Sequence, residues 1–196
     1  MKHLLVPSLF LLLGNSVSAQ DRLTVDAEAT KMIWTATKVT GAHTGGLTVE
    51  QGTVVANGGA LVSAHVVMDM TSITCTDMQG TGAERLVGHL KSADFFDTDQ
   101  HPSASFTSTK VEPIADALPG QPNYTITGDL TIKGITHPVT FACIVWRDGK
   151  ALRAAANLTF DRTKYDIKYR SGTFFPEIGD KMIHDEVSLT FDLKAE

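Results

Sequence analysis

The chain has 196 residues and a formal net charge of −5. This length suits a single domain with a substantial core. An acidic chain without a basic stripe argues against nucleic acid as a partner. Beyond the N-terminus no stretch is apolar enough to cross a bilayer, so we expect no integral membrane span.

Residues 1–19 are typical of a cleavable export signal. Lys2 and His3 form a short basic segment, and residues 4–13 are apolar apart from two positions. About ten apolar residues are too few to span a bilayer, which needs ~20, and Ala19 is a small residue suited to cleavage. The sequence therefore predicts cleavage after Ala19 and one domain over residues 20–196, in the periplasm or secreted.

The first half of the mature chain alternates between apolar and polar residues, as strands with one buried face do. The pattern predicts strands over residues 23–39 and 47–56, and another around residues 63–70. Gly41, Gly45 and Gly46 predict a turn between the first two strands. Asn57-Gly58-Gly59 predicts a hairpin, because these residues tolerate positive φ.

One segment changes to a helical period. Apolar residues recur at helical spacing over about 81–92, at Ala83, Leu86, Val87 and Leu90. Thr81 and Glu84 match a capping box, which predicts that the helix begins at Thr81. We expect this short helix to cover or flank the strands.

Alternation returns in the second half and is clearest at residues 124–133. Further strands are predicted over residues 104–109, 138–146, 152–160 and 187–193, with a hairpin at Asp148-Gly149 and a loop over 113–122. Strands joined mainly by hairpins predict an all-β antiparallel barrel or sandwich. About eight strands form a barrel wide enough for one ligand. Small inward residues favour an open interior, at Ala64, Ala104, Gly128, Ala154 and Ala156.

The chemistry-bearing residues form no specific motif. An exported protein can form a disulfide, here between Cys75 and Cys143, but two separate buried thiols are the alternative that we favour. No histidine pair has metal-binding spacing, so we expect no metal and no cofactor. Asp161, Asp166 and His184 lie in a charged C-terminal region. These residues suggest either a catalytic role in acid–base chemistry or a structural role, as ion pairs and turn caps at the rim of a barrel.

Three blocks of the chain resemble the YceI-like family. They are His89–Asp97 with His101–Phe106, Thr127–Val139, and Asp161–Ile167 with Gly179-Asp180. The resemblance implies a lipocalin-like antiparallel β-barrel, usually periplasmic, with an elongated apolar lumen for a polyisoprenoid or another long lipid, and it does not imply catalysis. The chain departs from shorter family members by an insertion over 173–178 and by Cys75.

Residues that share the inward parity of their strands are expected to line the lumen and to bind the ligand. They are Trp34, Val66, Met68, Phe106, Ile126, Leu130, Phe141, Leu158, Leu189 and Phe191. The sequence thus favours a non-enzymatic lipid carrier or reservoir. A periplasmic hydrolase or isomerase using Asp161, Asp166 and His184, and a ligand-free interaction module, remain as alternatives. The oligomeric state stays open, a homodimer included.

Overall fold

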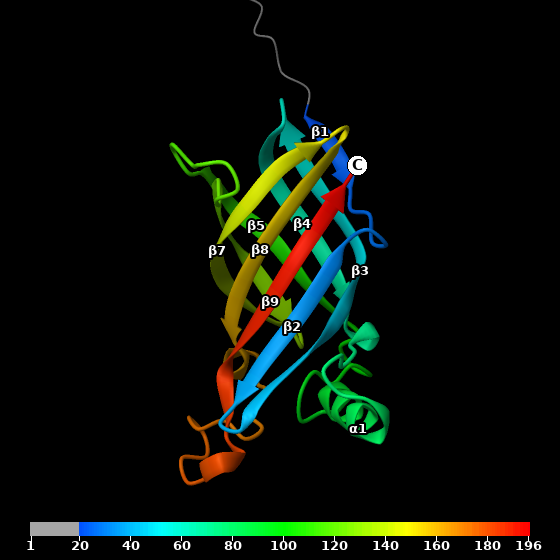
Figure 1. Ribbon diagram of the computed structural model, residues 1–196, viewed down its shortest axis with the longest axis vertical. Helices are drawn as coiled ribbons and strands as arrows, with labels where there is room; N and C mark the ends of the chain where they lie inside the picture. Colours follow the sequence, from blue (N-terminus) through cyan, green and yellow to red (C-terminus); the bar gives the residue numbers. More distant parts are fainter. Residues whose placement is uncertain (1–19) are drawn as a thin grey trace, which may run out of the picture.

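Figure 1 shows the computed structural model of the chain, which describes residues 20–196. The expected export signal lies outside the described residues. The strands are β1 (Asp21–Thr24), β2 (Lys31–Lys38), β3 (Gly41–Asn57), β4 (Ala60–Asp69), β5 (Ser103–Pro113), β6 (Tyr124–Ile132), β7 (Ile135–Asp148), β8 (Ala151–Asp161) and β9 (Ile183–Ala195). One α-helix, α1 (Gly80–Lys91), accompanies three 3₁₀ turns, η1 (Met70–Ser72), η2 (Arg162–Tyr165) and η3 (Gly179–Lys181).

Eight of the strands form a closed antiparallel barrel. The neighbours run β3-β2-β9-β8-β7-β6-β5-β4, and β4 pairs with β3 to close the ring. β3 makes this closure possible because its 17 residues pair with β2 along one part and with β4 along another. The short β1 covers the remaining edge of β3, where Leu23 pairs with Val54. The all-β prediction, with about eight strands and one short helix, is confirmed.

Two strand boundaries differ from those expected. Residues 23–39 form two strands rather than one, because the Asp26 carboxylate accepts hydrogen bonds from the backbone of Glu28 and Ala29 and fixes a turn. Gly45 and Gly46 lie within β3 instead of in a turn. A side chain at Gly45 would collide with the Thr74 carbonyl, so glycine serves a close approach here rather than a change of direction.

The hairpins and the helix follow the sequence prediction with one exception. Gly58, Gly59 and Gly149 adopt positive φ at the expected hairpins. The helix is present, but the expected capping box is wrong: α1 begins at Gly80 and its N-cap, Gln79, makes no side-chain cap bond. Gly80 itself has φ of +60°, so the chain turns into the helix one residue before Thr81. Among residues 20–196, no helix is long and apolar enough to cross a membrane.

The interior of the barrel is the core. Inward positions on successive strands are buried, as at Trp34, Val66, Leu130 and Leu189, and outward neighbours such as Asp129 and Thr190 are exposed. Gly128 is an exception among the small inward residues, because the Phe106 ring occupies the place of its missing side chain. Not every small residue therefore enlarges the interior.

A charge on either face of β9 should show which face is dry. Leu189→Asp places an unpaired carboxylate inside the barrel and should lower the free energy of unfolding by about 3 kcal/mol or more. Thr190→Asp, one residue along and exposed, is the control and should change it by less than about 0.5 kcal/mol. Urea unfolding measures both variants. Equal losses would mean that the assignment of faces is incorrect.

Candidate functional site

Two apolar chambers lie inside the barrel, each with a volume of about 70 Å³. The inner chamber is lined by hydrocarbon and one thiol, from Met32, Val54, Leu61, Ala64, Val66, Met68, Phe106, Ile126, Leu130, Phe141, Cys143, Leu152, Ala154, Leu158, Leu189, Phe191 and Leu193. Water in such a space finds no hydrogen-bonding side chain, and apolar cavities of this kind stay dry or take up apolar molecules.

The outer chamber lies between the inner one and the end of the barrel near α1. Its lining includes Trp34, Met70, Leu90, Phe95, Phe96 and Phe160. Met68, Leu130 and Leu189 line both chambers, so the two spaces meet at these three side chains. The two chambers therefore lie one behind the other inside the barrel.

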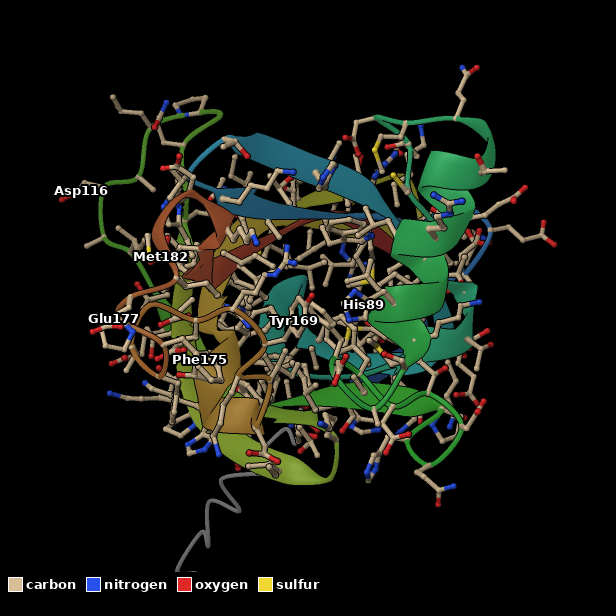
Figure 2. The ribbon with its side chains drawn as sticks, turned by 90° about the horizontal axis from the view of Figure 1, so that it is seen from below. His89, Asp116, Tyr169, Phe175, Glu177 and Met182 are labelled. Carbon is tan, nitrogen blue, oxygen red and sulfur yellow. The ribbon has the colours of Figure 1, made fainter. Side chains whose placement is uncertain are left out.

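A polar bay opens beyond the outer chamber and has a volume of about 450 Å³. A short passage lined by Trp34, Leu86, Leu90, Phe95 and Ile183 connects the bay with the outer chamber. Figure 2 looks into this end of the barrel, with α1 on one side and the segment after η2 on the other. The bay, the passage and the two chambers therefore adjoin one another in series, from the open end of the barrel inward.

Three rings lie across the boundary between bay and passage. The His89 ring lies 4.9 Å from Phe95 and 4.6 Å from Tyr169, and Phe95 lies 5.4 Å from Tyr169, all centroid to centroid. His89 comes from α1 and Tyr169 from the segment after η2, so the contact links opposite sides of the opening (Figure 2). A ligand that enters the chambers must pass beside this group of rings.

Trp34 is fixed where the passage meets the outer chamber. Its indole Nε1 donates a hydrogen bond of 2.9 Å to the Thr74 carbonyl, which lies over Gly45. The segment around Thr74 in turn bonds along β3, through Thr74 N to Gly46 O at 3.0 Å and Thr76 N to Thr44 O at 2.9 Å. The polar end of the indole is thereby satisfied, and its hydrocarbon faces the chamber.

Asp77 holds His43 at the wall of the bay. One carboxylate oxygen of Asp77 accepts a bond of 2.9 Å from Thr44 N, and the other lies 2.8 Å from His43 Nδ1. The Thr44 backbone bond, followed by the His43 contact, lowers the pKa of Asp77 to about 2. The His43 ring lines the bay.

The bay also carries unpaired cations. Lys38, Arg170 and Lys181 line it together with a single carboxylate, Asp180. None of the ion pairs found within residues 20–196 includes any of these three cations. The guanidinium of Arg170 instead lies 5.1 Å from the Tyr169 ring centroid. The opening therefore carries charged side chains with an excess of cations, whereas the chambers behind it are apolar.

Arg162 is the one charged side chain in the wall of the outer chamber. It is 2% exposed and donates to the carbonyls of His184, Ile167, Tyr169 and Ile183 and to the Asp185 carboxylate, at 2.8–3.2 Å. All of its nitrogens are used in these bonds, so it holds the irregular segments at this end of the barrel together. Its charge is therefore structural rather than available to a ligand.

All ten residues expected in the lumen line the two chambers. Their contact with a ligand remains a prediction. Sequence reasoning missed most of the outer chamber and the cations of the bay. Some of these residues, such as Met70, Leu90 and Arg170, come from turns, α1 and the segment after η2, where strand parity does not apply. Others, such as Leu47 and Phe160, lie on strands. Phe95 and Phe96 are adjacent residues between α1 and β5, outside any strand, and both line the outer chamber.

The two cysteines are free thiols, so the disulfide that the sequence allowed is not formed. Cys75 lies beside Asp77 near the bay, at 3.3 Å from its carboxylate, and Cys143 lines the inner chamber. Burial raises the pKa of Cys143 to about 12. The thiols therefore belong to different parts of the barrel, which explains why they do not pair.

The three residues suggested for catalysis make separate contacts. Asp161 caps η2 by accepting bonds from Thr163, Asp166 pairs with Lys168 at 2.6 Å, and His184 bonds to the Thr37 hydroxyl at 2.7 Å. Within residues 20–196, no group of three or more histidine, cysteine, aspartate and glutamate side chains could hold a metal ion. These contacts fit the interpretation as caps and ion pairs.

The Asp77 contact predicts a specific acid sensitivity. Since folding lowers the pKa of Asp77 from 3.8 to about 2, its contribution to stability is present above pH ~3.8 and is lost as the pH falls through ~2. Asp77→Asn should therefore be less stable than the wild type at pH 5, and the difference should shrink by pH 2. Urea unfolding at both values measures this. A difference of the same size at pH 2 would contradict it.

Residues 23–195 match the family described as the YceI-like domain. Protein YceI of Shigella flexneri is 46% identical over 69 residues, which cover 35% of this chain and 32% of that protein. A UPF0312 protein of Photorhabdus laumondii is 33% identical over 93 residues, 47% of this chain and 45% of that protein. The chain thus spans from a third to just under half the length of these curated relatives.

Solved structures with the same fold include BcnA of Burkholderia cenocepacia, with a TM-score of 0.67 and 22% identity over 88% of this chain and 99% of that one. A polyisoprenoid-binding domain of Saccharophagus degradans has a TM-score of 0.61 and 18% identity, and the match covers 89% of this chain and 97% of that domain. The YceI protein of Campylobacter jejuni has a TM-score of 0.54 and 16% identity, and the match covers 99% of this chain and 94% of that protein. The family match over nearly the whole barrel shows that this chain belongs to the YceI-like family.

Proposed function

We propose that this protein binds one long apolar chain, a polyisoprenoid or a similar lipid, inside its barrel and serves as a carrier or reservoir for it. The observation that carries the proposal is the series of adjoining spaces, from the bay through the passage to two hydrocarbon-lined chambers. Membership of the YceI-like family supports it. So does the fold shared with a solved domain that is described as polyisoprenoid-binding.

Burial of hydrocarbon supplies the affinity in this proposal. Each buried CH₂ contributes roughly 0.8 kcal/mol before the costs of ordering the ligand are subtracted. A ligand of several isoprene units then needs neither a covalent bond nor a polar clamp. The narrowness of the chambers favours an unbranched or lightly branched chain over a compact ring system.

The polarity of the path gives the ligand a direction. The inner chamber has no charged side chain in its lining, and the residues at its far end, such as Leu152 and Leu193, are buried. The bay at the other end offers His43, Lys38, Arg170 and Lys181. The apolar tail therefore lies in the inner chamber, and the polar end of the ligand remains in the bay.

The alternatives explain fewer of these features. A hydrolase or isomerase built on Asp161, Asp166 and His184 would need these groups to converge, and each has a separate local partner. A ligand-free interaction module would have no use for two connected apolar chambers. An activity screen with Asp166→Ala as the control distinguishes the enzyme from the carrier.

A series of isoprenoid alcohols of increasing length tests the binding mode by calorimetry. Affinity should rise with chain length until the chambers are full and then level off, because each added unit buries more hydrocarbon. Heat capacity should fall on binding, and moderate salt should change the affinity little, since screening acts on exposed charges. Equal affinity for short and long alcohols would contradict the proposal.

We also propose that the chain is exported and cleaved after Ala19. The family match begins at residue 23, after the proposed cleavage site, and this supports the boundary. The exported protein should begin at Gln20 and be found in the periplasm or the medium. Its intact mass measures this directly. A mass that includes residues 1–19 would show that the segment is retained.

A further inference from the structure

We propose that the open end of the barrel docks on the surface of an anionic phospholipid membrane, with Phe174 and Phe175 entering the lipid. The inference rests on the proposed function in one respect: a protein that holds a long apolar chain must exchange it with a lipid phase. The docking surface comprises Phe174, Phe175, Val39, Lys168 and Lys181.

The apolar part of this surface lies at the tip of the molecule. The loop between η2 and β9 reaches the lower end of the long axis in Figure 1, beyond the strand ends. Phe174 and Phe175 are 45% and 50% exposed on this loop, and Val39 is 49% exposed on the β2–β3 turn. Val39 N bonds to Met182 O at 3.2 Å, so the turn and the loop lie side by side. Figure 2 shows Phe175 at the rim, with Tyr169 and His89 nearer the centre.

The loop has a defined shape that holds both rings outward. Ser171 is fully buried, and its carbonyl accepts bonds from the backbone of Phe174 at 3.2 Å and Phe175 at 2.8 Å. The Thr173 hydroxyl donates 2.7 Å to Asp185, which is also bound to Arg162. Exposing two adjacent aromatic rings to water is unfavourable, and here a fixed backbone keeps them exposed. Such an apolar surface indicates a site of contact with another apolar surface.

Cations accompany these rings. Lys168 Nζ lies 5.2 Å from the centroid of the Phe174 ring and also pairs with Asp166, whereas Lys181 is in no ion pair found within residues 20–196. Residues 164–182 and Lys38 carry five cations against three carboxylates, in a chain whose formal net charge is −5. Aromatic rings that enter the interface, together with lysines that meet anionic head groups, are the composition with which peripheral proteins bind membranes.

A membrane fits this surface better than a protein does. Stable protein interfaces bury about 800 Å² on each partner, whereas here the exposed large apolar side chains are two rings and one valine. The path to the chambers opens beside the same loop, since Tyr169, Arg170, Lys181 and Ile183 line the bay. Docking there brings the opening to the lipid, so a long apolar chain need not be exposed to water during transfer.

Co-sedimentation with vesicles tests the proposal, using pure phosphatidylcholine vesicles and vesicles that contain phosphatidylglycerol. The mature protein should bind the anionic vesicles and bind the zwitterionic ones much less. The Phe174→Ser/Phe175→Ser double variant should bind anionic vesicles at least about tenfold more weakly. Leu118→Ser is the matched control, because Leu118 is 71% exposed on the loop between β5 and β6, at the opposite end of the barrel, and this variant should bind like the wild type.

Three results would overturn the proposal: no binding to anionic vesicles, equal binding to both kinds of vesicle, or unchanged binding by the double variant. Retention of an isoprenoid alcohol in the absence of vesicles is measured in parallel. The double variant should retain the alcohol as the wild type does but transfer it to vesicles more slowly. A protein that binds vesicles and retains no alcohol would show instead that the proposed function fails while the docking surface stands.

Discussion

The structure depends on the closure of the barrel at β3. A ring of eight strands has no free edge, so the backbone N–H and C=O groups of each strand pair with the strands on both sides, and the interior needs no polar side chain to satisfy them. The width of such a ring is set by the number and tilt of its strands rather than by the side chains inside it. With β3 pairing to β2 and β4 in turn, inward residues of moderate size leave the chambers open along the axis.

The open end of the barrel depends on a different interaction. Beyond β8 and before β9 the chain is irregular, and Arg162 holds it by bonding four carbonyls and Asp185. A buried cation is costly unless each of its donors has a partner, and here each nitrogen does. Arg162 thereby fixes Tyr169 in the bay and, through Asp185 and Thr173, the loop of Phe174 and Phe175. The closed ring of strands thus supports the apolar chambers, and the bonds of Arg162 support the bay. Arg162 belongs to both regions because it also lines the outer chamber.

The part of the site that lies on strands could be predicted from the sequence, because a period of two determines which side chains face inward. Trp34, Leu130 and Leu189 illustrate this. The bay could not, since it is assembled from α1, the ends of β2, β3 and β9 and the segment after η2, which meet only through tertiary contacts. Gly45 is the clearest example: it resembles a turn residue in the sequence, but it lies within a strand to admit the Thr74 carbonyl that fixes Trp34. The helix start shifted similarly, because the positive φ of Gly80 was not evident from the capping pattern.

The central claim is that the barrel holds one long apolar molecule. Native mass spectrometry of protein purified without detergent from the cells that produce it tests it most directly. The proposed function predicts a complex heavier than the polypeptide by the mass of one ligand, and extraction with organic solvent should release an apolar chain of that mass. A polypeptide that carries no added mass, with no lipid in the extract, would contradict the claim.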